Sequence, residues 1–301
     1  MITLQNECLR VQIAEPGEHP NDGCRFDRAG FITEVVLNNE RSFTANEPKN
    51  LSHPSTGGKG FCSEFRMDLS GEAKVGECYP KLGIGLIKKE TDEPYSFFGQ
   101  YEIEYFPVSY TVAETSVTFT TEPIPCQGYA VRMWKTIRLE GNSLITEHKL
   151  ENLGEKSVGA DEYCHNFISV DGMAISPDYS LTFCNLRSFE GETFPGVGKY
   201  THSNYIGKGH GLGFKQAETD VSMAKLHLTE SDVIAPAPFR WKVEHAGAKA
   251  CVEGEDSYMP EVITVWSTDH IVSPEVFNPL NVAPGETYCW SRKLTFIDKT
   301  R

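Results

Sequence analysis

Alternation of apolar and polar residues dominates the chain and predicts β-strands. The clearest run is YEIEYFPVSYTVAETSVTFTTE at 101–122, where β-branched and aromatic residues recur at nearly every second position. Residues 129–150 predict a hairpin, because two such runs flank EGNS, in which Gly141 and Asn142 provide the bend.

The same pattern argues against several fold classes. Strands do not alternate with long amphipathic helices, as they would in a parallel α/β barrel or a nucleotide-binding sheet. No repeat of fixed length indicates a propeller or β-helix. Strand and turn signals continue from Leu4 to Phe296, and the Gly- and Pro-rich stretches at 47–60 and 194–213 are too short for linkers. We therefore expect one domain over 1–301, with an all-β, mainly antiparallel fold.

Composition narrows the range of partners. Hydrophobic residues make up 39% and charged residues 23%, as in ordinary globular proteins. A net charge of −14, from 42 acidic and 28 basic residues, would repel nucleic acids and anionic membranes. The beginning, MITLQNECLRVQIAEP, lacks a signal-peptide pattern, and no apolar run is long enough to span a bilayer. We expect a cytoplasmic protein with neither a nucleic-acid nor a membrane partner.

The cysteines predict neither disulfides nor a metal site. Nine cysteines are widely scattered and never form a C-x-x-C pair, so we expect reduced thiols. The histidines and cysteines also lack metal-ligand spacing, so we expect no metal. Cys164 precedes a candidate histidine, and we interpret it as a small buried thiol rather than a nucleophile.

Two segments concentrate chemistry-bearing residues. DEYCHNFISV contains His165, and SPEVFNPLNV contains Glu275. Taken alone, a histidine is more often structural and a loop glutamate is more often solvated. Enclosure by Val276 and Phe277 would nevertheless favour a carboxylate that acts as a base.

The segment around His165 resembles the histidine motif of the aldose 1-epimerases, a galactose mutarotase-like family. In that motif a histidine precedes an aromatic residue and the apolar end of a strand, as His165-Asn166-Phe167 and Val170 do. The family's usual pattern is His-x-Tyr-Phe, and here Phe167 stands in place of the tyrosine.

The segment around Glu275 is similar to the family's glutamate motif. Pro274 precedes Glu275, and the turn Pro284-Gly285-Glu286 leads into a last aromatic strand, as in the family's terminal L-x-P-G-E pattern. Val282 occupies the leucine position. The similar features follow one another in order over about two thirds of the chain, from residue 100 to residue 297.

This resemblance implies a large antiparallel β-supersandwich with a concave sugar cleft. Glu275 as a carboxylate would take the proton of the anomeric hydroxyl, and His165 as an imidazolium would protonate the ring oxygen. The sugar ring would then open and close again on its other face. The implied reaction needs no cofactor, and it places the two side chains across a space about one sugar ring wide.

Other side chains are candidates for binding a small carbohydrate, because fork-shaped donors and flat rings suit polyols. They are Glu64, Arg66, Arg132, Lys135, Trp241 and, in a glycine-rich loop, His53. Each has a simpler interpretation. Glu64 and Arg66 would pair with each other, Arg132 and Lys135 would lie on a solvated strand face, and Trp241 would belong to the core.

Three functions share such a cleft: anomer interconversion, carbohydrate binding without catalysis, and glycan cleavage. Cleavage usually requires paired carboxylates, so a histidine with a glutamate favours ring opening. The sequence leaves open whether the sugar is a hexose, a hexose phosphate or a uronate, and whether the protein is a monomer or a homodimer.

Overall fold

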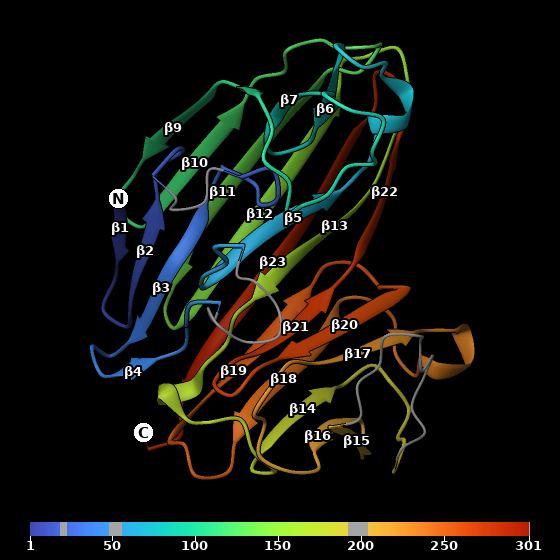
Figure 1. Ribbon diagram of the computed structural model, residues 1–301. Helices are drawn as coiled ribbons and strands as arrows, with labels where there is room; N and C mark the ends of the chain where they lie inside the picture. The colour runs from blue at the N-terminus through green and yellow to red at the C-terminus, as the bar shows by residue number, and fades with distance from the viewer. Residues whose placement is uncertain (19–22, 48–55, 192–203, 301) are drawn as a thin grey trace.

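The computed structural model describes residues 1–18, 23–47, 56–191 and 204–300. In these ranges nearly all regular structure is antiparallel strand, arranged in two large and two small sheets (Figure 1). Three short 3-10 turns complete the elements: η1 (Ser70–Glu72), η2 (Val170–Gly172) and η3 (Glu230–Asp232). The structure thus confirms the predicted all-β, antiparallel supersandwich.

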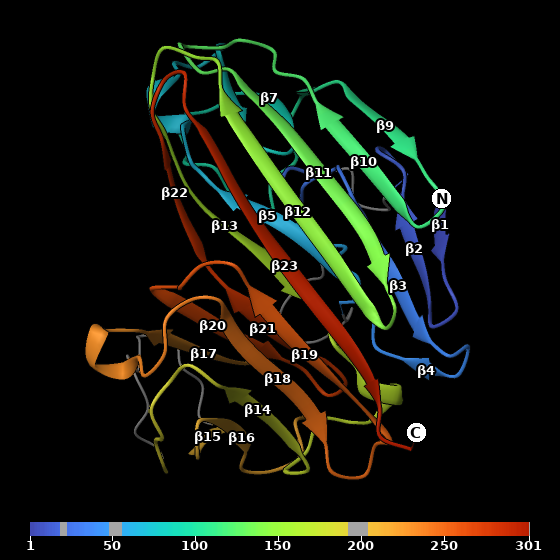
Figure 2. The same ribbon diagram turned by 180° about the vertical axis from the view of Figure 1, so that it is seen from behind.

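A ten-stranded sheet forms the back of the molecule (Figure 2). Its order is β15-β16-β14-β18-β19-β23-β12-β11-β10-β9. The predicted hairpin is confirmed, because β11 and β12 pair along their whole length around a turn at Gly141, whose φ is +54°. The strands are β9 (Val108–Val112), β10 (Ser116–Thr121), β11 (Val131–Glu140), β12 (Ser143–Asn152), β14 (Tyr179–Phe183), β15 (Tyr205–Lys208), β16 (Gly211–Phe214), β18 (Phe239–His245), β19 (Ala250–Asp256) and β23 (Thr287–Asp298).

A seven-stranded sheet packs in front of it, in the order β1-β2-β3-β5-β13-β22, with β4 on β3. The apolar residues that alternate along both sheets form the core between them. On β13 this alternation directs Glu162 toward the ten-stranded sheet and His165 toward the opposite face. The strands are β1 (Ile2–Gln5), β2 (Leu9–Ala14), β3 (Phe31–Leu37), β4 (Arg41–Ser42), β5 (Phe61–Arg66), β13 (Val158–Asn166) and β22 (Asn278–Val282).

Two three-stranded sheets flank the outward face of β5 and β13. One has the order β17-β20-β21 and the other β6-β7-β8. Their strands are β6 (Cys78–Lys81), β7 (Gly85–Lys88), β8 (Ile103–Tyr105), β17 (Ser222–His227), β20 (Val262–Ser267) and β21 (Val272–Val276). The described residues contain no helix long and apolar enough to cross a membrane. In the same ranges, no group of three or more His, Cys, Asp or Glu side chains is placed to hold a metal ion.

Candidate active site

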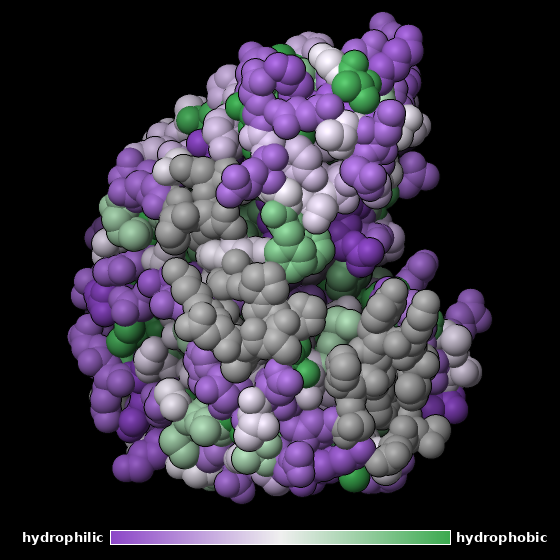
Figure 3. All heavy atoms as spheres, in the orientation of Figure 1, coloured by the Kyte–Doolittle hydropathy of each residue, from purple (hydrophilic) through white to green (hydrophobic). Residues whose placement is uncertain are grey.

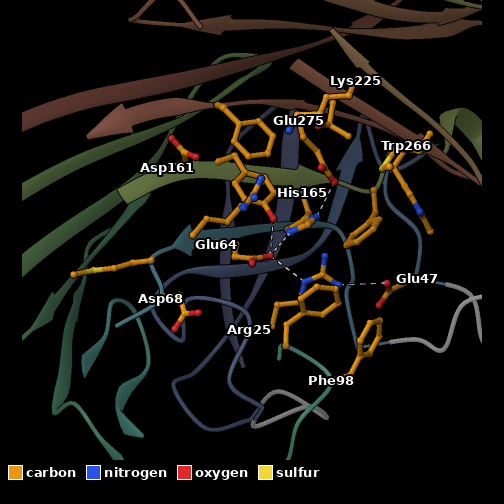
Figure 4. A pocket seen from close by; sticks show the side chains of 18 of the residues that line it. Arg25, Glu47, Glu64, Asp68, Phe98, Asp161, His165, Lys225, Trp266 and Glu275 are labelled. Carbon is orange, nitrogen blue, oxygen red and sulfur yellow. Dashed lines mark hydrogen bonds and ion pairs between the residues drawn. The ribbon is translucent and has the colours of Figure 1, made fainter. Parts of the chain in front are cut away.

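A cleft of about 760 Å³ opens on the outward face of β5 and β13. Strands β17, β20 and β21 form one side of it, and the loop after β7 forms part of the other. Figure 4 shows Lys225, Glu275 and Trp266 on the first side and Phe98 on the second, with His165 between them. The described residues that line it are Arg25, Glu47, Glu64, Arg66, Met67, Asp68, Lys81, Tyr95, Phe97, Phe98, Asp161, Tyr163, His165, Phe167, Val221, Met223, Lys225, Thr264, Trp266, Glu275 and Phe277.

Strand alternation places the polar side chains on the cleft face of β5 and β13. Every second residue of a strand points to the same face, so Asp161, Tyr163 and His165 share one face of β13. The neighbouring strand contributes Glu64 opposite Tyr163 and Arg66 opposite Asp161 in the antiparallel register. The result is a compact row of ionisable side chains across two paired strands.

Glu275 reaches this row because β21 lies against the end of β13. An isolated bridge pairs Ile168 with Val272, and the Asn166 side chain donates a hydrogen bond to the carbonyl of Pro274 at 2.6 Å. These contacts bring together two residues that are 110 positions apart in sequence.

His165 lies between two carboxylates. Its Nδ1 is 2.8 Å from Oε1 of Glu275, and its Nε2 is 2.8 Å from Oε2 of Glu64. The sequence predicted a gap one sugar ring wide between His165 and Glu275, and in this respect the prediction is wrong. Burial explains the difference, because His165 is only 2% exposed and a buried imidazole needs hydrogen-bond partners within the protein.

Glu64 is the more firmly held of the two carboxylates. Its Oε2 also accepts hydrogen bonds from Nε of Arg25 at 2.9 Å and from the hydroxyl of Tyr163 at 2.8 Å. Arg25 continues the network, because its Nη1 donates to Thr56 at 2.6 Å. Glu275 has one further contact, with the Ser273 hydroxyl at 3.2 Å.

The charges of these groups stabilise one another. Burial favours neutral His165, but Glu275 and Glu64 outweigh it and hold the pKa of His165 above its ordinary value. Burial also favours neutral Glu64, but the hydrogen bond from His165 and the charge of Arg25 hold the pKa of Glu64 well below its ordinary value. The surroundings therefore favour the imidazolium form of His165 and the carboxylate form of Glu64.

Several polar side chains of the cleft have no hydrogen-bond or ion-pair partner among the described residues. Arg66, Asp161, Lys225 and Thr264 have no side-chain hydrogen bond or ion pair with another described residue, although all four line the cavity. Lys225, Thr264 and Glu275 form a row across β17, β20 and β21 by register. These groups can donate to or accept from ligand hydroxyls.

A second buried charge cluster lies behind β13. Arg292 donates to both carboxylate oxygens of Glu162, at 2.8 and 2.6 Å, and to the hydroxyl of Tyr258 at 2.6 Å. That hydroxyl donates to the carbonyl of Val276 at 3.0 Å. One arginine thus contacts the strand that carries His165 directly and the strand that carries Glu275 through Tyr258.

The structure separates the candidate binding residues into two groups. Glu64 and Arg66 line the cleft, although Glu64 pairs with Arg25 rather than with Arg66. His53 lies outside the described residues.

The remaining candidates, Arg132, Lys135 and Trp241, are outside the cleft. Arg132 pairs with acidic neighbours on the outer face of the ten-stranded sheet, as its simpler interpretation predicted. Trp241 is a core residue whose indole donates to Asp256 at 3.0 Å. Lys135 is on neither a solvated face nor the cleft, because it is buried between the sheets, with Nζ 2.5 Å from Asp27.

The cysteine interpretation is confirmed. All nine cysteines lie in described residues and are free thiols. Burial raises the pKa of Cys164 to about 12, so its thiol is protonated at neutral pH and is a poor nucleophile.

The sequence did not point to three residues that matter here: Arg25, Tyr163 and Lys225. Tyr163 could have been found, because it lies two positions before His165 and therefore points to the same face of the strand. Lys225 alternates with apolar residues in SMAKLH, which places it on a strand face without saying what that face meets. Arg25 comes from a loop, and its position depends on contacts that no local pattern encodes.

Comparison with known proteins identifies the fold. No family model and no curated protein matches the sequence. A solved galactose mutarotase-like protein from Lactobacillus casei matches with a TM-score of 0.62 at 15% identity, covering 99% of this chain and 100% of that one. A galactose mutarotase related enzyme from Lactobacillus acidophilus matches with a TM-score of 0.59 at 12% identity, covering 99% of this chain and 97% of that one. An aldose epimerase homologue from C. elegans matches with a TM-score of 0.53 at 12% identity, covering 99% of this chain and 98% of that one.

The fold is therefore that of the galactose mutarotase-like proteins. The similarity extends over nearly the whole chain, beyond the residues 100–297 on which the sequence resemblance rests. A shared fold does not by itself define an activity, so the function has to be argued from the cleft.

Proposed function

We propose that the cleft binds a carbohydrate and interconverts its α and β anomers by opening the sugar ring. The observation that carries the proposal is the direct contact of His165 with Glu275 inside a cleft where several polar side chains have no hydrogen-bond partner among the described residues. The names of two solved structures with this fold, a mutarotase related enzyme and an epimerase homologue, support it.

Glu275 is the proposed base. Its Oε1 contacts His165 and Ser273, whereas its Oε2 has no hydrogen-bond partner among the described residues. This free oxygen is available to accept the proton of an anomeric hydroxyl. The side chain is only 8% exposed, which excludes most solvent from that transfer.

His165 is the proposed acid, and Nδ1 is the proposed donor atom. Nε2 contacts Glu64, which Arg25 and Tyr163 hold in place. Nδ1 contacts Glu275, which is less constrained. When Glu275 turns toward the anomeric hydroxyl, Nδ1–H becomes free to approach the ring oxygen.

The proton transfers balance within this pair. Glu275 takes the anomeric hydroxyl proton, the C1–O1 bond becomes a carbonyl, and the bond between C1 and the ring oxygen breaks. The ring oxygen takes the proton from Nδ1 of His165. Rotation about C1–C2 and reversal of the transfers give the other anomer, and Glu64 stays ionised throughout.

Carbohydrate binding without catalysis is the second candidate. One observation favours it: both nitrogens of His165 already have carboxylate partners, so neither N–H is free before a ligand arrives. Glycan cleavage is less well supported, because its general acid must be protonated. The low pKa of Glu64 keeps that carboxylate ionised.

Anomer exchange measured by NMR, with glucose, galactose and mannose, tests the proposal. We expect Glu275→Gln to lower the rate about 10²–10⁴-fold, the usual effect of losing a positioned acid or base. Glu253→Gln is the matched control, because Glu253 is exposed on β19 outside the cleft. Sugar binding without exchange would favour the second candidate, and an unaltered rate in Glu275→Gln would remove Glu275 from the mechanism.

A further inference from the structure

Two adjacent aromatic side chains are exposed at the cleft. Phe97 and Phe98 belong to the loop between β7 and β8, and they are 38% and 49% exposed. Their ring centroids are 4.2 Å apart, and both side chains line the cavity. Large apolar side chains that gather at a cavity indicate a contact surface. The space-filling view shows hydrophobic atoms gathered near the middle of this face, amid a mainly hydrophilic surface (Figure 3).

Contacts within the protein hold this aromatic pair in place. The guanidinium of Arg25 lies 4.4 Å from the ring centroid of Phe97, and its Nε donates to Glu64. The Tyr95 hydroxyl, from the same loop, donates to the carbonyl of Cys24 at 2.7 Å. Arg25 therefore connects Phe97 with Glu64, the carboxylate that contacts Nε2 of His165.

The cleft is larger than a single hexose ring. Its 760 Å³ corresponds to about 25 water molecules, at roughly 30 Å³ each. A free hexose has about 12 non-hydrogen atoms and two linked hexoses have about 23, and a covalently bonded atom takes up less volume than a water molecule. One ring at His165 would leave the aromatic end of the cleft unfilled.

We propose that Phe97 and Phe98 form a second sugar subsite, and that the ligand is a reducing oligosaccharide. This inference rests on the proposed carbohydrate function. The reducing ring alone carries a free anomeric hydroxyl, so it occupies the end at His165 and Glu275. The next ring then lies toward the loop after β7, where its C–H face packs on Phe98, because flat apolar rings favour such stacking.

Calorimetric binding measurements test the subsite with maltose, cellobiose and lactose against glucose and galactose. We expect at least one disaccharide to bind more tightly than its component hexoses. Phe98→Ala should weaken that disaccharide about 2- to 12-fold, the range of aromatic stacking contributions, and change hexose binding less than about twofold. Retained hexose binding shows that the variant is folded.

Two controls isolate the ring of Phe98. Phe98→Tyr keeps the aromatic face and should retain the disaccharide preference. Tyr110→Ala removes an aromatic ring that is 39% exposed on β9, outside the cleft, and should change neither affinity.

The outcomes separate this inference from the proposed catalysis. A Phe98-dependent disaccharide preference without anomer exchange supports the subsite and rejects the catalysis. Hexose exchange without tighter disaccharide binding supports the catalysis and overturns the subsite. Equal loss of hexose and disaccharide binding in Phe98→Ala also overturns it, because the ring would then belong to the first site.

Discussion

Replacing Glu64 with glutamine tests what keeps His165 charged. The substitution preserves the shape of the side chain and removes a negative charge from the point where three donors meet. In the wild type, Oε2 of Glu64 accepts from His165 at 2.8 Å, from Tyr163 at 2.8 Å and from Arg25 at 2.9 Å. Glutamine can accept through one amide oxygen but cannot supply the charge.

The size of the effect follows from the hydrogen bond to His165. A hydrogen bond to a charged group contributes about 1.5–3 kcal/mol. Each ~1.4 kcal/mol corresponds to a tenfold change, so loss of the whole bond would cost about 10- to 150-fold. Because the amide oxygen retains part of the bond, we expect Glu64→Gln to reduce anomer exchange about 10- to 50-fold. This loss is smaller than the one expected for Glu275→Gln.

The assay combines the exchange rate with ¹⁵N NMR of the imidazole as the pH is raised. Glu64 is among the groups that raise the pKa of His165, so this pKa should be lower in the variant than in the wild type. The proposed acid must be protonated, and the alkaline limb of the rate profile should therefore move to lower pH. An unaltered imidazole titration would refute the idea that Glu64 stabilises the charged form of His165.

Three further predictions concern the buried charges. Burial raises the pKa of Asp256 from 3.8 to about 6, which corresponds to about 3 kcal/mol. Neutral Asp256 contributes this stability below pH ~3.8, and the contribution is lost as the pH rises through about 6. Over this pH range the free energy of unfolding of the wild type, measured with urea, should fall by about 3 kcal/mol relative to that of Asp256→Asn. Arg292→Met leaves Glu162 buried without its partner and should cost about 3–5 kcal/mol in the same assay, with partial recovery in a double variant carrying Glu162→Gln. Lys135→Met should cost a similar ~3–5 kcal/mol by leaving Asp27 unpaired, and Asp27→Asn should restore part of it.

Much of the fold was predictable because strand alternation is a local signal. Each residue of β11 points to the face opposite its neighbours, and the same alternation also places two of the candidate binding residues in the core. Lys135 points to the same face of β11 as Met133 and Ile137, which are both buried, and this places its side chain between the sheets. Trp241 likewise points to the same face of β18 as Phe239 and Val243, which belong to the core.

The candidate site was predictable only in part, because proximity in a cleft is a tertiary property. His165 and Glu275 stood out through their segments, and the structure places their side chains in contact. Neither segment indicates that Arg25 and Glu64 complete the network from other parts of the chain. The second carboxylate at His165 follows from the pairing of β5 with β13, which sequence alternation does not specify.

The two buried cations should differ in what they support, and this difference connects the core to the chemistry. Arg292 contacts Glu162 on β13 and, through the Tyr258 hydroxyl, the backbone carbonyl of Val276, which directly follows Glu275. Its loss should displace β13 and β21 relative to each other and lower anomer exchange under conditions where the variant remains folded. Lys135 contacts Asp27 and the carbonyl of Ala29, neither of which has a hydrogen bond or ion pair with His165 or Glu275. Lys135→Met should therefore reduce stability while leaving exchange by the folded protein intact, and equal loss of exchange in both variants would contradict a positioning role for Arg292.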